Sequence, residues 1–176
     1  MLEKFALPLA LLFAAAACAP ADRAPTDAVQ EEVAELWSDD TRTLLIGDAA
    51  NALARQCSRV SPGPVEGAWT PSEEQLEALE DQLILLVARE LENAGQTPSP
   101  GGYYRQYAGF IIGGRQIIYV NGVDEAGIDS DPGPAFHPGN WREHAIRICD
   151  GGTITFGAEY DPATQQISNF AFNGPY

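Results

Sequence analysis

Short turns between the apolar segments in the second half of the chain restrict the fold more than any other feature. After Gly102 the hydrophobic pattern changes from helical to strand-like, and Gly113-Gly114 is a two-residue hairpin signal. Strands joined by such turns pair antiparallel, because a parallel pair needs a crossover of a dozen or more residues. The predicted strands are Tyr103 to Ile112, Arg115 to Val120, Trp141 to Cys149, Thr153 to Tyr160 and Ile167 to Phe172.

A long amphipathic helix is predicted ahead of these strands. Thr70 as N-cap, Pro71 as first helical residue and Glu73 as capping-box partner are consistent start signals, and Asn93-Ala94-Gly95 is a stop signal. The apolar residues on one face are Leu76, Leu79, Leu83, Leu86, Val87 and Leu91. The acidic residues, which form either a solvated face or an acidic docking surface, are Glu73, Glu74, Glu77, Glu80 and Asp81.

Two shorter helices are predicted before the long one. The first covers Thr26 to Trp37, with Val29, Val33, Leu36 and Trp37 at helical spacing. The second begins at Asp40 or Thr41, and its apolar stripe is Leu44, Leu45, Ala49, Ala52, Leu53 and Cys57. We therefore expect one α+β domain over 27–176, in which N-terminal helices precede a meandering antiparallel sheet of about five strands packed on the long helix. This order of elements is similar to that of cystatin-like folds.

The first seventeen residues have the three-part layout of a signal peptide. A polar start carrying Lys4 is followed by an apolar run from Phe5 to Ala17, which is well short of the roughly 20 residues that a membrane-spanning helix needs. Ala15-Ala16-Ala17-Cys18 resembles the lipobox of bacterial lipoproteins, with Ala15 where the commoner box has Leu. The resemblance implies a lipid on Cys18, and the Ala- and Pro-rich composition that follows predicts a flexible tether over 18–26. Cleavage without lipidation, which would give a soluble periplasmic or secreted protein, is the alternative.

The three cysteines fit export to an oxidising compartment. An odd thiol would be reactive there, and a lipid on Cys18 leaves Cys57 and Cys149 as a pair. A bridge closing a loop of about 90 residues contributes roughly 4 to 5 kcal/mol in the chain-entropy model. Two buried thiols are the alternative to this disulfide.

The charge of the chain disfavours several classes of partner and mechanism. With 25 acidic and 10 basic residues the net charge is -15, so attraction to nucleic acids or anionic lipid surfaces is not expected. The only lysine is Lys4, within the leader. The processed chain therefore has no lysine for a Schiff base, a phosphate-binding loop or a Ser-Lys dyad, and no cofactor is expected.

The long irregular connection over 123–140 contains the candidate metal ligands. Asp129, Asp131 and His137 are the candidates, and Asp124 and Glu125 offer further carboxylate oxygens. Their spacing does not match the calcium-binding loop pattern, and a solvated acidic loop is the alternative interpretation.

No catalytic residue is predicted from the remaining reactive side chains. His144 lies within a predicted strand and is interpreted as a packed structural imidazole. Cys149 beside Asp150-Gly151-Gly152 is compatible with a cysteine hydrolase, but a disulfide with Cys57 is the simpler role. A group of aromatic residues forms either a recognition surface or part of the core; these are Tyr103, Tyr104, Tyr107 and Trp141.

These features favour a non-catalytic binding domain in the bacterial cell envelope. The run CDGGTITFGAEYDPATQQISNFAFNG also resembles small uncharacterised exported proteobacterial proteins. The leading interpretation is a lipoprotein held to the membrane through Cys18, facing the periplasm or the exterior, that binds an envelope protein or component. The alternatives are a metal-dependent or hydrolytic enzyme using the 123–140 loop, and an inhibitor of an envelope enzyme.

Overall fold

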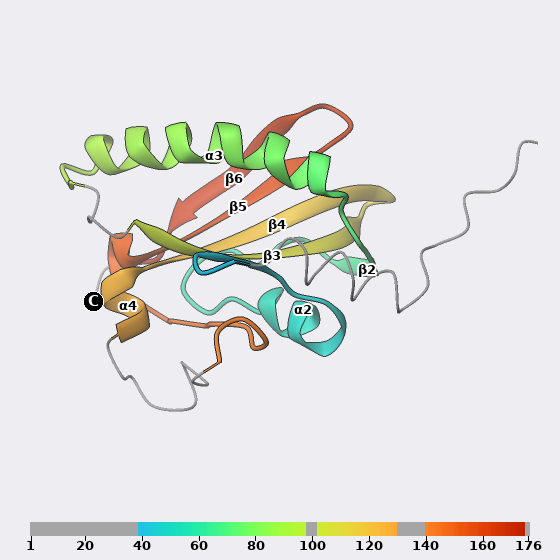
Figure 1. Ribbon diagram of the computed structural model, residues 1–176, viewed down its shortest axis with the longest axis horizontal. Helices are drawn as coiled ribbons and strands as arrows, with labels where there is room; N and C mark the ends of the chain where they lie inside the picture. The colour runs from blue at the N-terminus through green and yellow to red at the C-terminus, as the bar shows by residue number, and fades with distance from the viewer. Residues whose placement is uncertain (1–38, 98–101, 130–139, 175–176) are drawn as a thin grey trace, which may run out of the picture.

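One curved sheet of six strands organises the fold (Figure 1). The computed structural model describes residues 39–97, 102–129 and 140–174. Along the chain the elements are β1 (Arg42–Leu44), α2 (Gly47–Leu53), β2 (Val65–Trp69), α3 (Glu73–Asn93), β3 (Tyr103–Ile112), β4 (Arg115–Asp124), α4 (Glu125–Asp129), the 3-10 helix η1 (Gly152–Ile154), β5 (Thr155–Asp161) and β6 (Gln166–Phe172). The predicted α+β class is confirmed, with six strands in place of about five.

The last four strands form the predicted antiparallel meander. Strands β3 and β4 pair from Tyr103 opposite Asp124 to Ile112 opposite Arg115. The backbone φ angles of Gly113 and Gly114 are 57° and 70°, as the primed two-residue turns of hairpins require. Strand β5 then pairs with β4, and β6 pairs with β5.

Two short strands share the other edge of β3. Strand β1 lies parallel to its first half, with Arg42 in register with Arg105, while β2 lies antiparallel to its second half. Neither strand was predicted from sequence. The helix predicted from Asp40 to Cys57 is therefore wrong over most of its length, because only Gly47–Leu53 is helical. The backbone before it hydrogen-bonds to β3 instead, and Leu45 N donates to Tyr107 O at 2.8 Å.

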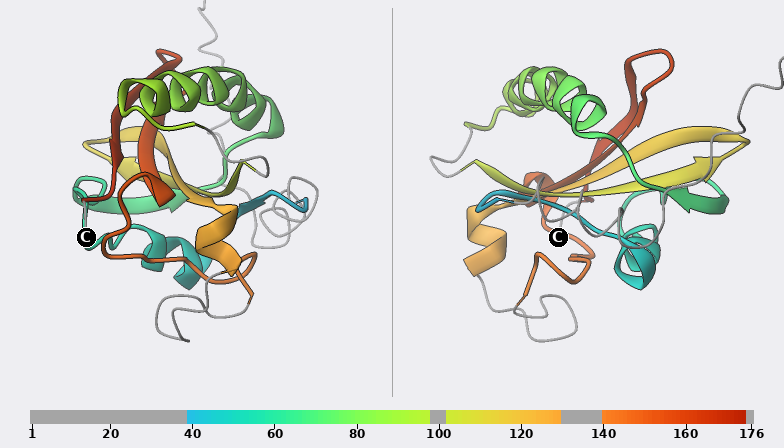
Figure 2. Two further views of the ribbon diagram at one scale, coloured as in Figure 1. Left: turned by 90° about the vertical axis from the view of Figure 1, so that its left-hand side faces the viewer. Right: turned by 45° about the vertical axis from the view of Figure 1, so that its right-hand side comes forward.

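The long helix α3 covers one face of the sheet, and β5 and β6 rise beside it (Figure 2). It begins two residues later than predicted: Ser72 is the N-cap, its Oγ accepts from Gln75 N at 3.3 Å, and Gln75 Oε1 accepts from Ser72 N at 2.8 Å. The apolar stripe packs on the sheet in the main core, which includes Leu76, Leu79, Leu83, Val87, Leu91, Tyr107, Ile118, Val120, Phe156 and Tyr160.

Short elements and irregular segments cover the opposite face. Helix α2 packs there through Leu53, which joins Phe110 and Tyr119 of the sheet in a second apolar cluster. Segments 54–64 and 140–151 lie on the same side and are joined by a disulfide between Cys57 and Cys149, with their Cα atoms 5.0 Å apart.

The segment Trp141 to Cys149 is not the predicted strand. Its backbone finds a side chain in place of a neighbouring strand: Gln106 Nε2 donates to Trp141 O and to His144 O, both at 2.6 Å, and Ile146 N donates to Gln106 Oε1 at 2.8 Å. The Gln106 side chain thus supplies hydrogen bonds that the backbone of a neighbouring strand would otherwise make. The predicted helix over 26–37, the leader and the tether lie outside the described residues.

Candidate functional site

An apolar groove runs beside the C-terminal half of α3, between the helix and the start of β3. Its volume is about 220 Å³. Two members of its α3 wall, Ile84 and Ala88, are exposed at the rim. The lining residues are Leu83, Ile84, Val87, Ala88, Leu91, Gly102, Tyr103, Arg105 and Phe156. Almost all of this surface is carbon, which suits an apolar side chain or segment.

The floor of the groove is formed where β4 has a glycine that a neighbouring aromatic ring covers. Gly122 is in register with Arg105 on one side and with Phe156 on the other. The Phe156 ring lies over it, so a Cβ at Gly122 would come within 2.0 Å of that ring. Phe156 also packs edge-on against Tyr103, with ring centroids 5.1 Å apart. These two aromatic rings form an apolar floor.

The middle of α3 carries more apolar side chains than its packing needs. Ile84 is 60% exposed and Leu85 is 72% exposed, although the helix already buries Leu83 and Val87 against the sheet. Large apolar side chains at neighbouring exposed positions often mark an interaction site. The run LILLVA, which is apolar on all sides of the helix, is the sequence signal that could have identified this site.

A charged cluster closes the groove toward β1. Arg105 Nε donates to Glu80 Oε1 at 2.9 Å, and both side chains are largely buried. The Tyr107 hydroxyl donates to the same carboxylate oxygen. Burial and then the nearby Glu80 charge raise the pKa of Tyr107 well above its usual value, so it stays protonated at physiological pH. The cluster therefore holds α3 on the sheet as a fixed network.

A smaller pocket of about 130 Å³ continues past the end of α3. Tyr103 and Leu91 line both cavities, and Asp124 and Thr153 contribute polar groups to the smaller one. The Tyr103 hydroxyl donates to Thr153 O, which fixes the ring between the two cavities. Burial, and then the Asp124 charge, raise the pKa of Tyr103 above its ordinary value.

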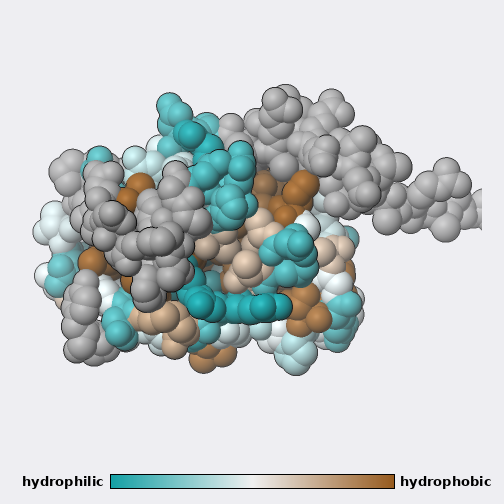
Figure 3. Space-filling model, turned by 90° about the horizontal axis from the view of Figure 1, so that it is seen from below, coloured by the Kyte–Doolittle hydropathy of each residue, from teal (hydrophilic) through white to brown (hydrophobic). Residues whose placement is uncertain are grey.

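A larger hollow of about 580 Å³ lies across the molecule, between α2 and Pro62-Gly63-Pro64. Its charged and amide side chains, Asp48, Asn51 and Arg55, are exposed. Figure 3 shows hydrophilic and apolar residues side by side on this face of the molecule. We favour the apolar groove of about 220 Å³ beside α3 as the candidate site, because its apolar lining is continuous.

Buried polar side chains on this opposite face are engaged in structural contacts. Arg59 donates to the Tyr119 hydroxyl at 3.1 Å and also to Asn121 and Asn173. Asn173 Nδ2 in turn donates to the backbone oxygen atoms of Ile148 and Asp150, at 2.6 and 3.0 Å. Together with the disulfide, this network attaches segments 54–64 and 140–151 to the sheet.

The residues predicted as metal ligands are not assembled in the described part of the chain. Asp131 and His137 lie outside it, as does Cys18, and Asp129 ends α4 with its side chain undescribed. Among residues 39–97, 102–129 and 140–174, no three His, Cys, Asp or Glu side chains form a group that could hold a metal ion.

Two predictions about individual aromatic residues can be compared with the structure. His144 was interpreted as a packed strand residue, but it is exposed in a turn, where its Nδ1 lies 3.3 Å from Asn140 O. Tyr103 and Tyr107 share the face toward α3 and are buried. Tyr104 points to the other face and packs edge-on against Trp141, with centroids 5.2 Å apart.

Comparisons with known proteins leave the family open. No protein-family model, no curated protein and no solved structure matches the chain. Within the described residues, no helix combines the length and apolar character needed to cross a bilayer.

Proposed function

We propose that the protein is an exported, lipid-anchored binding domain of the cell envelope and that the groove beside α3 is its contact surface. The anchor would be a lipid on Cys18, with the domain facing the periplasm or the exterior. The observation that carries the binding role is the apolar groove, with Ile84 60% exposed at its rim. A rim of this kind is stabilised when another apolar surface covers it.

The disulfide supports the location outside the cytoplasm. Cys57 and Cys149 are 92 positions apart, and their bridge joins two segments that otherwise depend on side-chain hydrogen bonds. Bridges of this type persist in oxidising compartments and are rare in the cytosol.

Mass spectrometry of the membrane fraction tests the anchor: we expect a lipidated Cys18 as the first residue. A soluble form that begins beyond Cys18 would contradict it.

Site-specific photo-cross-linking in the producing cell tests the binding role. We expect a photoreactive residue in place of Ala88, at the groove rim, to give a discrete adduct with an envelope component. The matched control is the same residue in place of Val60, which is apolar and 91% exposed but does not line the groove. The adduct should weaken when Ile84→Asp is added. Equal labelling at both positions, or none at Ala88, would refute the groove as a contact surface.

A further inference from the structure

We infer that the partner segment that fills the groove beside α3 is a cationic amphipathic helix. This partner chemistry rests on the proposed binding role and deepens it. An apolar side chain of the partner enters the groove between Ile84 and Ala88 on one side and β3 on the other. Lysine or arginine side chains of the partner, one and two helical turns away, lie against Asp81 and Glu77.

The groove suits a side chain of a larger partner better than a free small molecule. Its volume is about 220 Å³, which is below the roughly 300 to 1,000 Å³ of typical small-molecule pockets. Its α3 wall is open at the rim, where Ile84 is 60% exposed and Ala88 is exposed as well. A larger partner can insert one apolar group and cover the rim with the surface around that group.

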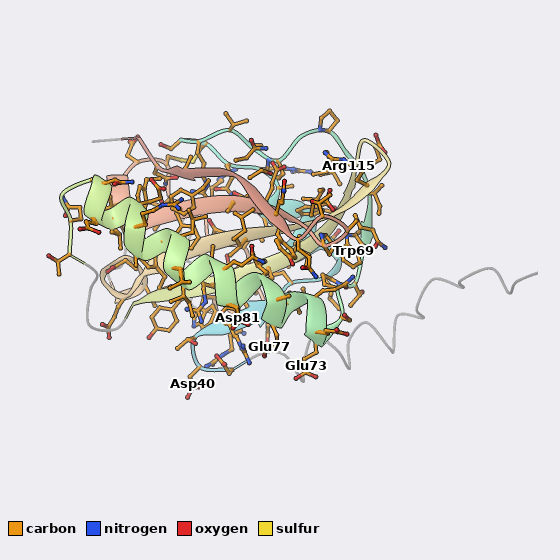
Figure 4. The ribbon with its side chains drawn as sticks, turned by 90° about the horizontal axis from the view of Figure 1, so that it is seen from above. Asp40, Trp69, Glu73, Glu77, Asp81 and Arg115 are labelled. Atoms are coloured by element: carbon orange, nitrogen blue, oxygen red, sulfur yellow. A yellow bond between two sulfur atoms is a disulfide. The ribbon has the colours of Figure 1, made fainter. Side chains whose placement is uncertain are left out.

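Acidic side chains continue the same side of α3 toward its N-terminus. Positions 73, 77, 81 and 84 are three or four residues apart, so they lie on one side of the helix. The first three are Glu73, Glu77 and Asp81, which are all exposed. Figure 4 shows these three carboxylates along the side of α3 that faces Asp40. This side of α3 therefore changes from acidic to apolar within one helical turn, between Asp81 and Ile84.

This acidic row is only partly neutralised by the protein itself. Arg42 Nη1 lies 3.4 Å from Glu77 Oε1, and Nε of the same guanidinium lies 2.9 Å from Asp39 Oδ2. Within the described part of the chain, neither Glu73 nor Asp81 forms an ion pair. Like charges at i and i+4 on a helix repel each other and destabilise it. A cation supplied by a partner relieves that repulsion.

Arginines at and beside the groove do not offset this negative charge. Arg105 lines the groove, but its Nε donates to Glu80 Oε1 at 2.9 Å, and both side chains are largely buried. Arg89 follows Ala88 on α3, about 100° further around the helix, and its Nη2 lies 3.0 Å from Glu90 Oε1. The surface that a partner meets is thus apolar and negative, which is complementary to an apolar and positive segment.

The spacing of the acidic row indicates where the cations of the partner belong. Along the axis of α3, Asp81 is about 4.5 Å and Glu77 about 10.5 Å from Ile84, at 1.5 Å per residue. A partner helix that lies alongside α3 has the same rise per residue. Cations about three or four and about seven positions from its apolar anchor therefore come opposite these two carboxylates.

Binding of synthetic helical peptides to the chain without its leader, 18–176 with Cys18→Ser, tests this partner chemistry. The first peptide has about 18 residues, enough for a helix to form, with leucine at the anchor and lysine at the spacing given above. The second peptide has glutamine in place of every lysine, and the third has alanine in place of every leucine. Fluorescence anisotropy measures the dissociation constants. We expect the first peptide to bind at least about fivefold more tightly than either of the others, because charge and apolar contact both contribute.

Matched charge variants locate the contact on the protein. The double variant Glu77→Gln, Asp81→Asn should weaken binding of the lysine peptide at least about fivefold and leave binding of the glutamine peptide unchanged. The control double variant Asp48→Asn, Glu66→Gln removes two charges at exposed positions on α2 and β2 that do not line the groove. It should change the affinity less than about twofold at about 0.15 M salt, where the screening length is about 8 Å.

A matched pair of apolar variants tests whether the peptide enters the groove. Ile84→Ser should weaken binding of the lysine peptide at least about fivefold, because it removes apolar surface at the rim. Leu85→Ser should change that affinity less than about twofold, since Leu85 is more exposed but does not line the groove. Equal effects of the two variants would overturn the assignment of the groove as the binding surface for this helix.

Salt dependence completes the test. Raising the salt from about 0.01 M to about 0.15 M should weaken binding of the lysine peptide and leave binding of the glutamine peptide almost unchanged. Equal affinity of these two peptides would overturn the inferred partner chemistry, as would equal losses in the two double variants or no binding of any peptide. The proposed binding role is tested separately, because an adduct at position 88 in the cell would still identify the groove as a contact surface for a partner of other chemistry.

Discussion

The two faces of the sheet are covered in physically different ways. On one face a single regular helix, α3, buries a stripe of leucines and a valine against aromatic and β-branched strand residues. On the other face short and irregular segments are held by Gln106, by the network around Arg59 and Asn173, and by one disulfide. Apolar burial tolerates an open groove beside the helix, whereas the second cover depends on individual bonds whose partners are far apart in sequence. The face covered by α3 is thus the better candidate for contacts with a binding partner.

Removing the disulfide should have the largest effect on stability. The Cys57→Ser, Cys149→Ser double variant should lose about 4 kcal/mol, because the bridge closes a loop with a sequence separation of 92. Urea unfolding with and without reductant measures the loss. Hydrogen exchange should show that 140–151 loses protection before α3 does. A parent protein equally stable with and without reductant would contradict the importance assigned to this bond.

Truncating a core side chain on the α3 face should have the next largest effect on stability. Leu79 is fully buried in the main core, so Leu79→Ala should destabilise the protein by about 3 kcal/mol through lost apolar contact and the cavity left behind. The midpoint of urea unfolding should fall with an unchanged slope. Leu85→Ala on the same helix is the control, since Leu85 is 72% exposed. Similar losses in both variants would mean that the outer side of α3 is covered.

Replacing Gln106 should weaken the opposite cover alone. Gln106→Met keeps the volume but leaves Ile146 N, Trp141 O and His144 O without the partner they have now. A buried polar group that loses its hydrogen-bond partner destabilises a protein by about 1 to 3 kcal/mol. We expect a loss of about 2 kcal/mol in total for Gln106→Met, because water can reach part of the segment. Hydrogen exchange should be faster at Ile146, with α3 unaffected. Gln116→Met, at an exposed position on β4, should change nothing.

Tyr107 should make stability sensitive to alkaline pH. Its pKa is raised in the folded state by burial and then by Glu80, from an ordinary value of 10.0. Above pH 10 the unfolded state releases this proton while the folded state retains it, so its contribution is complete below pH 10 and declines above it. The slope is about 1.4 kcal/mol per pH unit for one proton. Tyr107→Phe should reduce the stability lost between pH 10 and about 11 by roughly 1 kcal/mol, because the unfolded tyrosine is only partly ionised over that range. An unchanged loss would show that Tyr107 ionises in the folded protein.

The sequence predicted the elements whose signals are local. The 3.6-residue period predicted α3, and the glycine pair predicted the β3–β4 turn. Alternation predicted β5, and the turn at 161–164 predicted β6. Prediction failed where a distant partner decides the structure. Residues 42–44 form a strand because β3 offers an edge at Arg105–Tyr107, and 141–149 remain irregular because Gln106 satisfies their backbone. The groove depends in the same way on Gly122 and Phe156, whose neighbouring positions no local pattern reveals.

The smallest effect should come from the groove rim, and it bears most directly on function. Ile84→Ser should change the free energy of unfolding by less than about 0.5 kcal/mol, because a side chain that is 60% exposed contributes little to the core. Chemical unfolding of the variant and of the parent protein measures the difference. A small loss leaves the exposure of Ile84 to be explained by contact with a separate partner, as the proposed function requires. A loss as large as that of Leu79→Ala would show that Ile84 is already covered in the free protein, and the groove rim would then no longer favour a partner.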